Sequence, residues 1–529
     1  MKSCFLLCVV LLTSVSFGQN PTIGLRYKAD GVSGGYTLFT PEKNKDVYLI
    51  NNCGEVINTW NFSERPGLTC YLLDNGNLLR AGKDSLEIRD WDNNVVWSYD
   101  MASNGISQHH DIEPLPNGNI LCVVHDEYSD VTMLAEGRDP SITDVNFKLD
   151  KIVELSPVGT NNATIVWEWK FIDHFIQDFD NSKNNYGVVE DHPELIDLNF
   201  DNGKTEDWTH VNSVDYNQSL DQIIISARHL NEIYIIDHST TTAEAASHVG
   251  GDSNMGGDIL WRWGNTEVYR QGTVADEQLF LQHDAQWVQD GFLDATKISV
   301  FNNGGDGTGS HSSIHLIEPV INAGVYSMDS DIFLPADFDW SWTGSILSES
   351  FQEGKKCGVQ SLENGNMILC ENSKGQLTEV AKNGEIVWVY KNPTGSNNYV
   401  QSDIILNGNN SIFRGEKYAT DFVGFTGKDL TPQLIIEDEN LVSDTCIYSL
   451  EVSGKNINSS HLLNNIVDDL LMFNQHLDEV VIYNLEGKIV ILFTAINADF
   501  IYLNIEPGMY IVETITIGGE IRKQKIVIK

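Results

Sequence analysis

The sequence predicts an all-β protein, a six-bladed β-propeller followed by a small C-terminal β-sandwich. A turn cassette with Asn-Gly-Asn recurs around Asn75, Asn117 and Asn364, and Asn-Gly supplies the positive φ angle that a tight hairpin needs. Since β-branched strands dominate and no long amphipathic helix is found, radial repetition of small antiparallel sheets is the favoured architecture. Six aromatic strand ends predict six such sheets, and they lie at Trp60, Trp97, Trp167, Trp261, Trp340 and Trp388.

The uneven spacing of these tryptophans leaves a second architecture open, two packed β-sandwiches. The propeller requires inserted loops, and the segments rich in Asn, Asp and Gly at residues 173–207 and 302–309 are expected on its faces. We assign residues 19–405 to the propeller, residues 406–460 to a linker and the start of the C-terminal region, and residues 461–529 to the C-terminal domain.

Residues 1–18 predict a secretory signal peptide. Lys2 gives a positive start, an apolar run follows from Phe5 to Val15, and small residues occur at Ser16 and Gly18. This run is too short for a spanning helix, and no later stretch is apolar long enough to cross a bilayer. We therefore expect export through the periplasm to the cell surface or the medium, without an integral membrane segment.

The charge of the chain excludes two classes of partner. The sequence has 33 Lys plus Arg against 75 Asp plus Glu, a formal net charge of −42. Such a polyanion repels nucleic-acid phosphates and anionic lipids, so neither is an expected partner. Hydrophobic residues make up 41% of the chain, which is enough to bury a large core.

The cysteines that remain after the signal peptide are even in number, as in proteins of oxidising compartments. The sequence leaves open whether Cys53 pairs with Cys70, or Cys357 with Cys370. No CxxC pair occurs, which argues against a cysteine-rich zinc site.

Three histidines share one position relative to the turn that follows them. His110, His210 and His283 each lie seven residues before the Asn or Asp of a turn. Equivalent positions of different blades lie at one height, and the innermost strand of a blade faces the central channel. The three imidazoles are therefore expected to converge, although any one of them alone would more often bond a backbone carbonyl. The histidines without this register are expected at the surface or behind the site: His109, His125, His229, His311 and His315.

A guanidinium and an amide are expected beside these imidazoles. If the hairpin turns near Ser219, antiparallel pairing places Arg228 beside His210. Asn212 faces the same side as His210 because it lies two residues further along the strand. Taken alone, Arg228 would more often be a surface ion-pair partner in so acidic a chain.

This set of groups suits a tetrahedral oxyanion better than a metal ion. A planar guanidinium binds oxyanions with paired donors, and a neutral imidazole can act as the nucleophile when an anionic group is transferred. Zinc or copper is the alternative occupant, but no HExxH motif is present and Arg228 would repel a cation. No metal and no other cofactor is therefore expected.

The stretches that carry these residues resemble the bacterial arylsulfate sulfotransferase family. The matching segments are GYTLFTP, YLINNCGEVINTW, HHDIEPLPNGNIL, WTHVNSVDYN, HDAQWVQDG and GQLTEVAKNGEIVWVYKNP, which together span about residues 35–395. The resemblance implies a six-bladed propeller that moves a sulfuryl group from a phenolic sulfate ester to a phenol without the adenosine-phosphosulfate cofactor. It also implies a ping-pong cycle through a sulfated histidine.

The resemblance implies a role for each predicted site residue. It makes His283 the nucleophile, and it implies that His210, Asn212 and Arg228 hold the sulfuryl oxygens. His110 then assists as acid, base or oxygen ligand. The alternative function is that of a non-catalytic secreted propeller that binds an anionic glycan, peptide or protein.

The choice of His110 over its neighbour His109 rests on a recurring dipeptide. His-Asp occurs at His110 and again at His283, where Asp284 follows. The Asp after each His could orient an imidazole, or it could face away from it on a pleated strand.

The C-terminal residues 461–529 differ in kind from the rest of the chain. Strand-like stretches such as VVIYNLEGKIV and PGMYIV end in a basic strand, QKIVIK. They resemble the type IX secretion sorting domain, a small β-sandwich, and this resemblance implies the type IX secretion machinery as a partner. An ordinary accessory sandwich is the alternative, but a basic strand in an acidic protein favours sorting.

Overall fold

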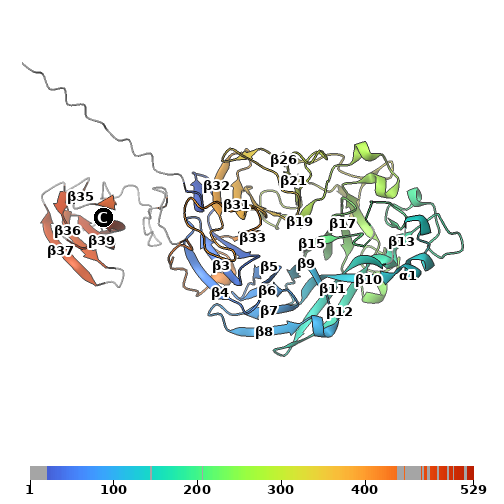
Figure 1. Ribbon diagram of the computed structural model, residues 1–529, viewed down its shortest axis with the longest axis horizontal. Helices are drawn as coiled ribbons and strands as arrows, with labels where there is room; N and C mark the ends of the chain where they lie inside the picture. Colours follow the sequence, from blue (N-terminus) through green and yellow to red (C-terminus); the bar gives the residue numbers. More distant parts are fainter. Residues whose placement is uncertain are drawn as a thin grey trace, which may run out of the picture. The chain divides into compact units, whose positions relative to one another are not determined.

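The described part of the chain consists almost wholly of β-strands, as predicted (Figure 1). The computed structural model describes residues 21–142, 146–204, 206–437, 446, 466–467, 470–473, 477–484, 488–496, 500–503, 505–516 and 521–528. The predicted signal peptide lies outside the described residues, as does much of the predicted linker after residue 437. The chain divides into two compact units, residues 1–440 and 441–529. None of the described helices is long and apolar enough to cross a membrane.

Six antiparallel sheets of four or five strands make up most of the described first unit. The first sheet has the spatial order β33 (Ile412–Tyr418), β2 (Tyr36–Pro41), β3 (Asp46–Asn51) and β4 (Val56–Asn61). The second has β5 (Pro66–Leu72), β6 (Leu78–Gly82), β7 (Ser85–Arg89) and β8 (Val95–Asp100). The third has β9 (Gln108–Pro114), β10 (Ile120–Ser129), β11 (Asn146–Val158) and β12 (Asn162–Lys170).

The other three sheets follow the same plan, from an inner strand to an outer one. The fourth has β15 (Val211–Asn217), β16 (Gln222–Ala227), β17 (Glu232–Asp237) and β18 (Ile259–Trp263). The fifth has β19 (His283–Trp287), β20 (Ile298–Asn302), β21 (Ser313–Ile317) and β26 (Trp340–Trp342). The sixth has β29 (Gly358–Ser361), β30 (Met367–Glu371), β31 (Gln376–Val380), β32 (Ile386–Lys391) and β1 (Gly24–Lys28).

Short elements fill the loops between these strands. Two α-helices are described, α1 (Asp130–Ala135) and α2 (Thr242–Ala245), along with short 3-10 turns. A parallel pair is formed by β13 (Phe175–Ile176) and β14 (Ile196–Asp197). Three small ribbons are β22 (Ile321–Asn322) with β23 (Val325–Tyr326), β24 (Met328–Asp329) with β25 (Ile332–Phe333), and β27 (Ser345–Ile346) with β28 (Glu349–Ser350).

The six predicted tryptophans join neighbouring sheets. Each lies in the fourth strand of a different sheet, and its indole Nε1–H donates to a connecting loop or, for Trp97, to a strand end of the next sheet along the chain. The first bond runs from Trp60 to the carbonyl of Asp90 at 2.8 Å. The last runs from Trp388 back to the carbonyl of Asn52 in the first sheet, also at 2.8 Å. The sixth sheet is thus bonded to the first.

The two ends of the first unit interlock. β33 follows the sixth sheet in the sequence but pairs with β2, while β1 precedes the first sheet but pairs with β32. The domain boundary expected at residue 405 therefore lies before the last strand of this unit, because the first sheet takes its inner strand from the C-terminal side. Inner strands also contact one another in a closed order, β5–β9–β15–β19–β29–β33 and back to β5.

Apolar side chains fill the space between neighbouring sheets. One core cluster lies between the third and fourth sheets and another between the fifth and sixth. The cysteines in these sheets belong to this buried interior, and Cys70, Cys357 and Cys370 have free thiols. Both pairings considered from the sequence are therefore wrong.

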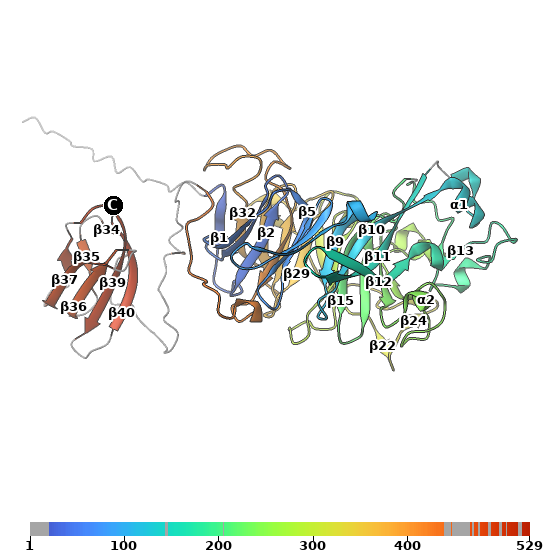
Figure 2. The same cartoon turned by 90° about the horizontal axis from the view of Figure 1, so that it is seen from below.

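The described residues of the second unit form one larger sheet and one short pair (Figure 2). Its core contains Leu471, Leu477, Val480 and Ile526. The larger sheet has the order β34 (Ile466–Val467), β40 (Ile521–Ile528), β39 (Gly508–Thr516), β36 (Leu477–Tyr483) and β37 (Ile489–Ile496). The short pair is β35 (Leu470–Met472) with β38 (Phe500–Tyr502).

Candidate active site

The three predicted histidines stand at the start of three neighbouring inner strands. His110 lies in β9, His210 directly precedes β15, and His283 opens β19. A β-bulge interrupts the pairing of each of these strands close to the histidine, and bulges re-aim side chains beside functional sites. The φ angles of His110 and His210 are 60° and 48°, a left-handed conformation that costs a non-glycine residue on the order of 1–3 kcal/mol.

The structure corrects the predicted register for His210. The hydrogen bonds between neighbouring inner strands show which positions are equivalent. By these bonds, His110 in β9 corresponds to His283 in β19, and the equivalent residue in β15 is Asn212 rather than His210. His210 lies two residues earlier, because Asn217 is still a paired residue of β15 rather than part of the turn. The bonds that set the alignment join Asp111 Oδ2 to Val214 N (3.0 Å), Ser213 Oγ to Ala285 N (3.0 Å) and Asp284 Oδ2 to Val359 N (2.7 Å).

His110 and His210 nevertheless meet. Their Nε2 atoms are 3.1 Å apart, and Nδ1 of His210 is hydrogen-bonded to the carboxylate of Asp207. Because a carboxylate only accepts, a neutral His210 carries its proton on Nδ1, and its Nε2 accepts the Nε2–H of His110. Nδ1 of His110 then has a lone pair, and this buried atom has no hydrogen-bond partner among the described residues. Burial, followed by the charges of His109 and His210, lowers the pKa of His110 well below its usual value.

His283 is held as a neutral imidazole with its lone pair on Nε2. Its Nδ1 lies 2.7 Å from the Oδ1 of Asn303 and 3.1 Å from the carbonyl of Leu281, which both accept, so Nδ1 carries the proton. Nε2 accepts the backbone N–H of Lys356 at 3.0 Å. The ring is 1% exposed, and burial, then the nearby charge of Arg228, lowers the pKa of His283 well below its usual value.

Arg228 lies beside His210, as antiparallel pairing predicts. Its backbone N–H donates to the carbonyl of His210 at 3.2 Å. Its guanidinium is 2.7 Å from Nε2 of His229, and its Nε is buried without a partner among the described residues. Arg228 therefore keeps a free donor, and its charge is felt at His283.

Asn212 is fully buried between the inner strands. Its Nδ2 donates to the carbonyl of Gln282 at 2.7 Å, directly before His283 in the sequence. Its Oδ1 has no partner in the described part of the chain. Asn212 thus uses one amide N–H to hold β19 beside β15, and its second amide N–H stays available.

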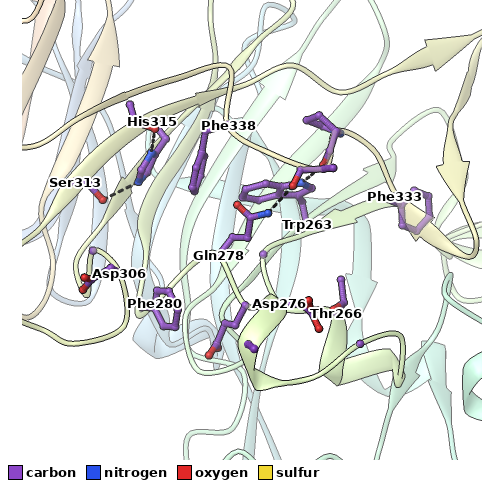
Figure 3. A pocket seen from close by; sticks show the side chains of 18 of the residues that line it. Trp263, Thr266, Asp276, Gln278, Phe280, Asp306, Ser313, His315, Phe333 and Phe338 are labelled. Atoms are coloured by element: carbon purple, nitrogen blue, oxygen red, sulfur yellow. Dashed lines mark hydrogen bonds between the residues drawn. The ribbon is translucent and has the colours of Figure 1, made fainter.

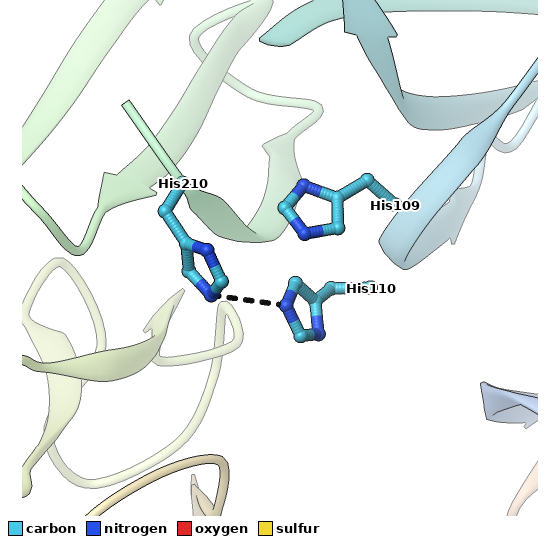
Figure 4. Close-up of side chains that lie close together, drawn as sticks. All are labelled: His109, His110 and His210. Carbon is cyan, nitrogen blue, oxygen red and sulfur yellow. Dashed lines mark hydrogen bonds between the residues drawn. The ribbon is translucent and has the colours of Figure 1, made fainter. Parts of the chain in front are cut away.

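Three histidines that the turn register does not select belong to the same cluster. The ring centroid of His109 is 4.2 Å from that of His110 and 3.9 Å from that of His125, and His229 lies 4.5 Å from His210 (Figure 4 shows His109, His110 and His210). Their place could not be found from the sequence, because they reach the site from differing offsets relative to the turns.

A buried carboxylate ties this cluster to the strand that follows His210. Asp150 is fully buried and bonds Nδ1 of His109 at 2.8 Å. It also accepts from the backbone N–H of Val211 at 2.6 Å and from the hydroxyl of Thr209 at 3.0 Å. Burial acts to raise the pKa of Asp150, but the hydrogen bonds and charges of His109 and His125 bring it below the usual value.

A comparison with protein families shows to which family this chain belongs. The family described as Arylsulfotransferase (ASST) matches residues 44–327, which include all five predicted site residues. The chain belongs to the arylsulfotransferase family. Membership implies a sulfotransferase that acts on aryl donor and acceptor substrates.

Solved structures similar to this chain share little sequence with it. A protein of unknown function from Bacteroides caccae is 12% identical, with 68% of this chain and 94% of that chain covered and a TM-score of 0.36. Virginiamycin B lyase from Staphylococcus aureus, in a catalytically inactive form, is 10% identical, with 70% and 89% covered and a TM-score of 0.32. The Cps50 (Swd1) β-propeller domain of Myceliophteria thermophila is 10% identical, with 70% and 90% covered and a TM-score of 0.33. No curated protein matches the chain.

Arg414 fixes the inner strands just behind the histidines. Its Nη1 lies 2.7 Å from Asp111 and its Nε 3.0 Å from Asp284, so the Asp after His110 and the Asp after His283 each form an ion pair with Arg414 rather than contact an imidazole. Its Nη2 donates to the carbonyl of Asn212 at 3.0 Å. Sequence reasoning missed Arg414 because β33 lies in the segment expected to be a linker.

A separate aromatic cavity of about 790 Å³ opens between the fourth and fifth sheets (Figure 3). It contains none of the five predicted site residues. His315 stacks on Phe338 with a centroid distance of 3.6 Å, and Ser313 and Ser341 each bond one of its ring nitrogens at 2.7 Å. Burial lowers the pKa of His315 to about 3, so this histidine is a neutral structural group.

Proposed function

We propose that this protein is an exported aryl-sulfate sulfotransferase that works by a ping-pong cycle through a sulfated His283, without adenosine-phosphosulfate. The observation that carries the proposal is the state of His283. Asn303 holds the proton on Nδ1, and among the described residues the only bond to Nε2 comes from the backbone N–H of Lys356, which must give way when Nε2 attacks. A neutral imidazole with a fixed lone pair is what nucleophilic attack on a sulfate ester requires.

In the first half of the cycle the donor ester gives up its sulfuryl group. Nε2 of His283 attacks the sulfur, the N–S bond forms, and the bond between sulfur and the aryl oxygen breaks. The aryl oxygen leaves with the bonding electrons, and the His110–His210 pair, when it carries an extra proton, supplies the proton that makes the phenol. His110 therefore acts as the acid in this half.

Two groups are positioned to donate to the sulfuryl oxygens. Nε–H of Arg228 has no partner among the described residues and Asn212 has a second amide N–H, whereas Nε2 of His210 accepts from His110 and can donate only after it gains a proton. Donors that are already in place stabilise charge on the equatorial oxygens without reorganisation. The stabilisation is strong because these groups are buried.

In the second half the acceptor phenol takes the sulfuryl group. Its oxygen attacks the sulfur, the N–S bond breaks, and His283 regains its lone pair. The phenolic proton passes to Nδ1 of His110, the buried nitrogen that has no partner in the described part of the chain. The imidazole pair thus regains the proton that it gives up in the first half, so the cycle consumes none.

The remaining parts of the chain fit this function. We propose that the six sheets are the six blades of a propeller, with the site at the inner strands of the third to fifth blades. We further propose that residues 1–18 direct export and that residues 461–529 form a β-sandwich recognised by the type IX secretion machinery. The protein would then act at the cell surface or in the medium.

The test is a chromogenic aryl sulfate given to the purified protein with and without a phenol. The proposal expects phenolate release only when the acceptor is present, together with formation of the new sulfate ester. Release with water alone would identify a sulfatase instead. No release from a folded protein would favour a non-catalytic propeller that binds an anionic glycan, peptide or protein.

A further inference from the structure

We propose that His109, His110 and His210 form a binding site for one divalent transition-metal ion, zinc by preference. The ligand nitrogens of these three side chains all lie within 4.8 Å of one another. Figure 4 shows the three rings turned toward a common point. His283 is not part of this group, so the metal site and the proposed nucleophile are separate features.

The spacing of the nitrogens is close to that of a zinc site. Zinc binds histidine nitrogen at about 2.0–2.1 Å in tetrahedral geometry, which puts two ligand nitrogens about 3.3 Å apart. Nε2 of His110 and Nε2 of His210 are 3.1 Å apart. A small rotation of the rings therefore replaces their mutual hydrogen bond with two bonds to a metal.

Two of the three rings have a carboxylate behind them. Nδ1 of His109 is bonded to Asp150, and Nδ1 of His210 is bonded to Asp207. Metal-binding histidines almost always donate their second ring N–H to such a partner, which fixes the tautomer and raises the basicity of the ligand nitrogen. The two carboxylates also balance the two charges of the ion and so offset the repulsion expected from Arg228.

The third ring, His110, can become a ligand without losing a proton. Its Nδ1 is buried and has no partner among the described residues. The proton on Nε2 can therefore move to Nδ1 when the metal binds.

Metal at this site has a consequence for the activity. The same nitrogens are the ones assigned to the sulfuryl group and its proton, so a bound ion excludes the donor and inhibits transfer. This consequence rests on the proposed function, whereas binding of the ion does not.

Binding is tested on the full chain after dialysis against a chelator. Titration with Co²⁺ should give visible absorption bands of a nitrogen-ligated tetrahedral ion that saturate at one ion per chain, and Zn²⁺ should remove them. His109→Asn should lose the bands. His192→Asn should keep them, because His192 is a half-exposed histidine paired with Glu194 outside the group.

Two further variants separate metal binding from folding and from catalysis. Asp150→Asn should weaken binding about 10–100-fold through the second ring nitrogen of His109, with unfolding temperature recorded alongside. His283→Asn should bind the ion as well as the unmodified chain even if transfer is lost. The absence of saturable one-to-one binding would overturn the proposal, and so would a folded His109→Asn protein that binds Co²⁺ as tightly as the unmodified one.

Discussion

At the scale of the residue, the chemistry depends on where each imidazole carries its proton. His283 has Nδ1 fixed by Asn303, while His210 has Nδ1 fixed by Asp207. These two partners leave both Nε2 atoms as acceptors at the same site. Such assignments cannot be made from a sequence, because the partners lie on other strands.

The pH dependence of transfer should respond to Arg228. Burial and then the charge of Arg228 lower the pKa of His283, and only neutral His283 attacks. Activity should therefore persist below the ordinary pKa of a histidine and fall only when pH drops through the lowered pKa of His283. In Arg228→Gln the repelling charge is gone, so this pKa rises and the acid limb of kcat/KM moves to higher pH.

The measurement is a pH–rate profile for the two proteins with a donor that does not titrate in the range used. Arg270→Gln removes a more exposed arginine that pairs with Asp178, and its acid limb should stay in place. An unchanged acid limb in Arg228→Gln would show that the guanidinium does not act on the nucleophile.

At the scale of the element, β33 closes the first sheet and carries Arg414 to the centre. The side chain of Arg414 is 4% exposed and lies between the carboxylates of Asp111 in β9 and Asp284 in β19, two inner strands on either side of β15. Burial raises the pKa of Asp284 to about 6, and the charge of Arg414 opposes this effect. The arrangement couples the strands that hold His110 and His283.

Arg414→Leu should destabilise the protein strongly. It leaves Asp111 and Asp284 buried without a counter-charge, which costs about 3–5 kcal/mol for a broken buried pair. Chemical unfolding should give the loss in free energy, and Arg414→Lys should lose less because it keeps the charge. A leucine variant as stable as the unmodified protein would show that these ion pairs do not hold the inner strands.

Truncation should distinguish the two positions of the domain boundary. A chain of residues 19–437 keeps β33 and should unfold cooperatively, as judged by circular dichroism and calorimetry. A chain of residues 19–405 lacks the strand that pairs with β2 and leaves that edge and its apolar neighbours exposed, so it should aggregate or remain unfolded. Equal folding of both chains would contradict the closing role of β33.

Local sequence patterns predicted individual strands well, but they did not predict which distant segments pair. The six tryptophans mark one strand in each sheet because a repeated local sequence makes the same hairpin each time. The predicted register of His210 was wrong because it assumed that the turn begins at Asn217. Asn217 instead pairs with Gln222, so the turn begins after it, and this pairing cannot be seen in the sequence. β33 and Arg414 were missed because closure joins segments hundreds of residues apart, which leaves no local signal.

At the scale of the whole molecule, the net charge of −42 opposes the arrival of an anionic donor. The site itself is less unfavourable to an anion than the rest of the protein, because the positive charges of Arg228 and Arg414 lie in it or directly behind it. Long-range repulsion acts on the rate of encounter and is screened by salt, whereas short contacts inside the buried site are screened much less.

Salt should therefore speed the reaction of the donor. Raising ionic strength from 10 to 150 mM shortens the screening length from about 30 to about 8 Å, and kcat/KM for the aryl sulfate should rise. The KM for a neutral phenol acceptor should stay nearly constant, which controls for general effects of salt on the enzyme. A fall in kcat/KM for the donor would mean that local positive charge steers it and outweighs the net charge.

The most direct test of the central claim is to locate the sulfuryl group on the enzyme. The protein is incubated with an aryl sulfate and no acceptor, digested under mildly alkaline conditions, and its peptides are analysed by mass spectrometry. The proposed cycle predicts one sulfuryl group on His283, which disappears when a phenol is added, and no modification in His283→Asn. A sulfuryl group on another residue, or full transfer activity in His283→Asn, would contradict it.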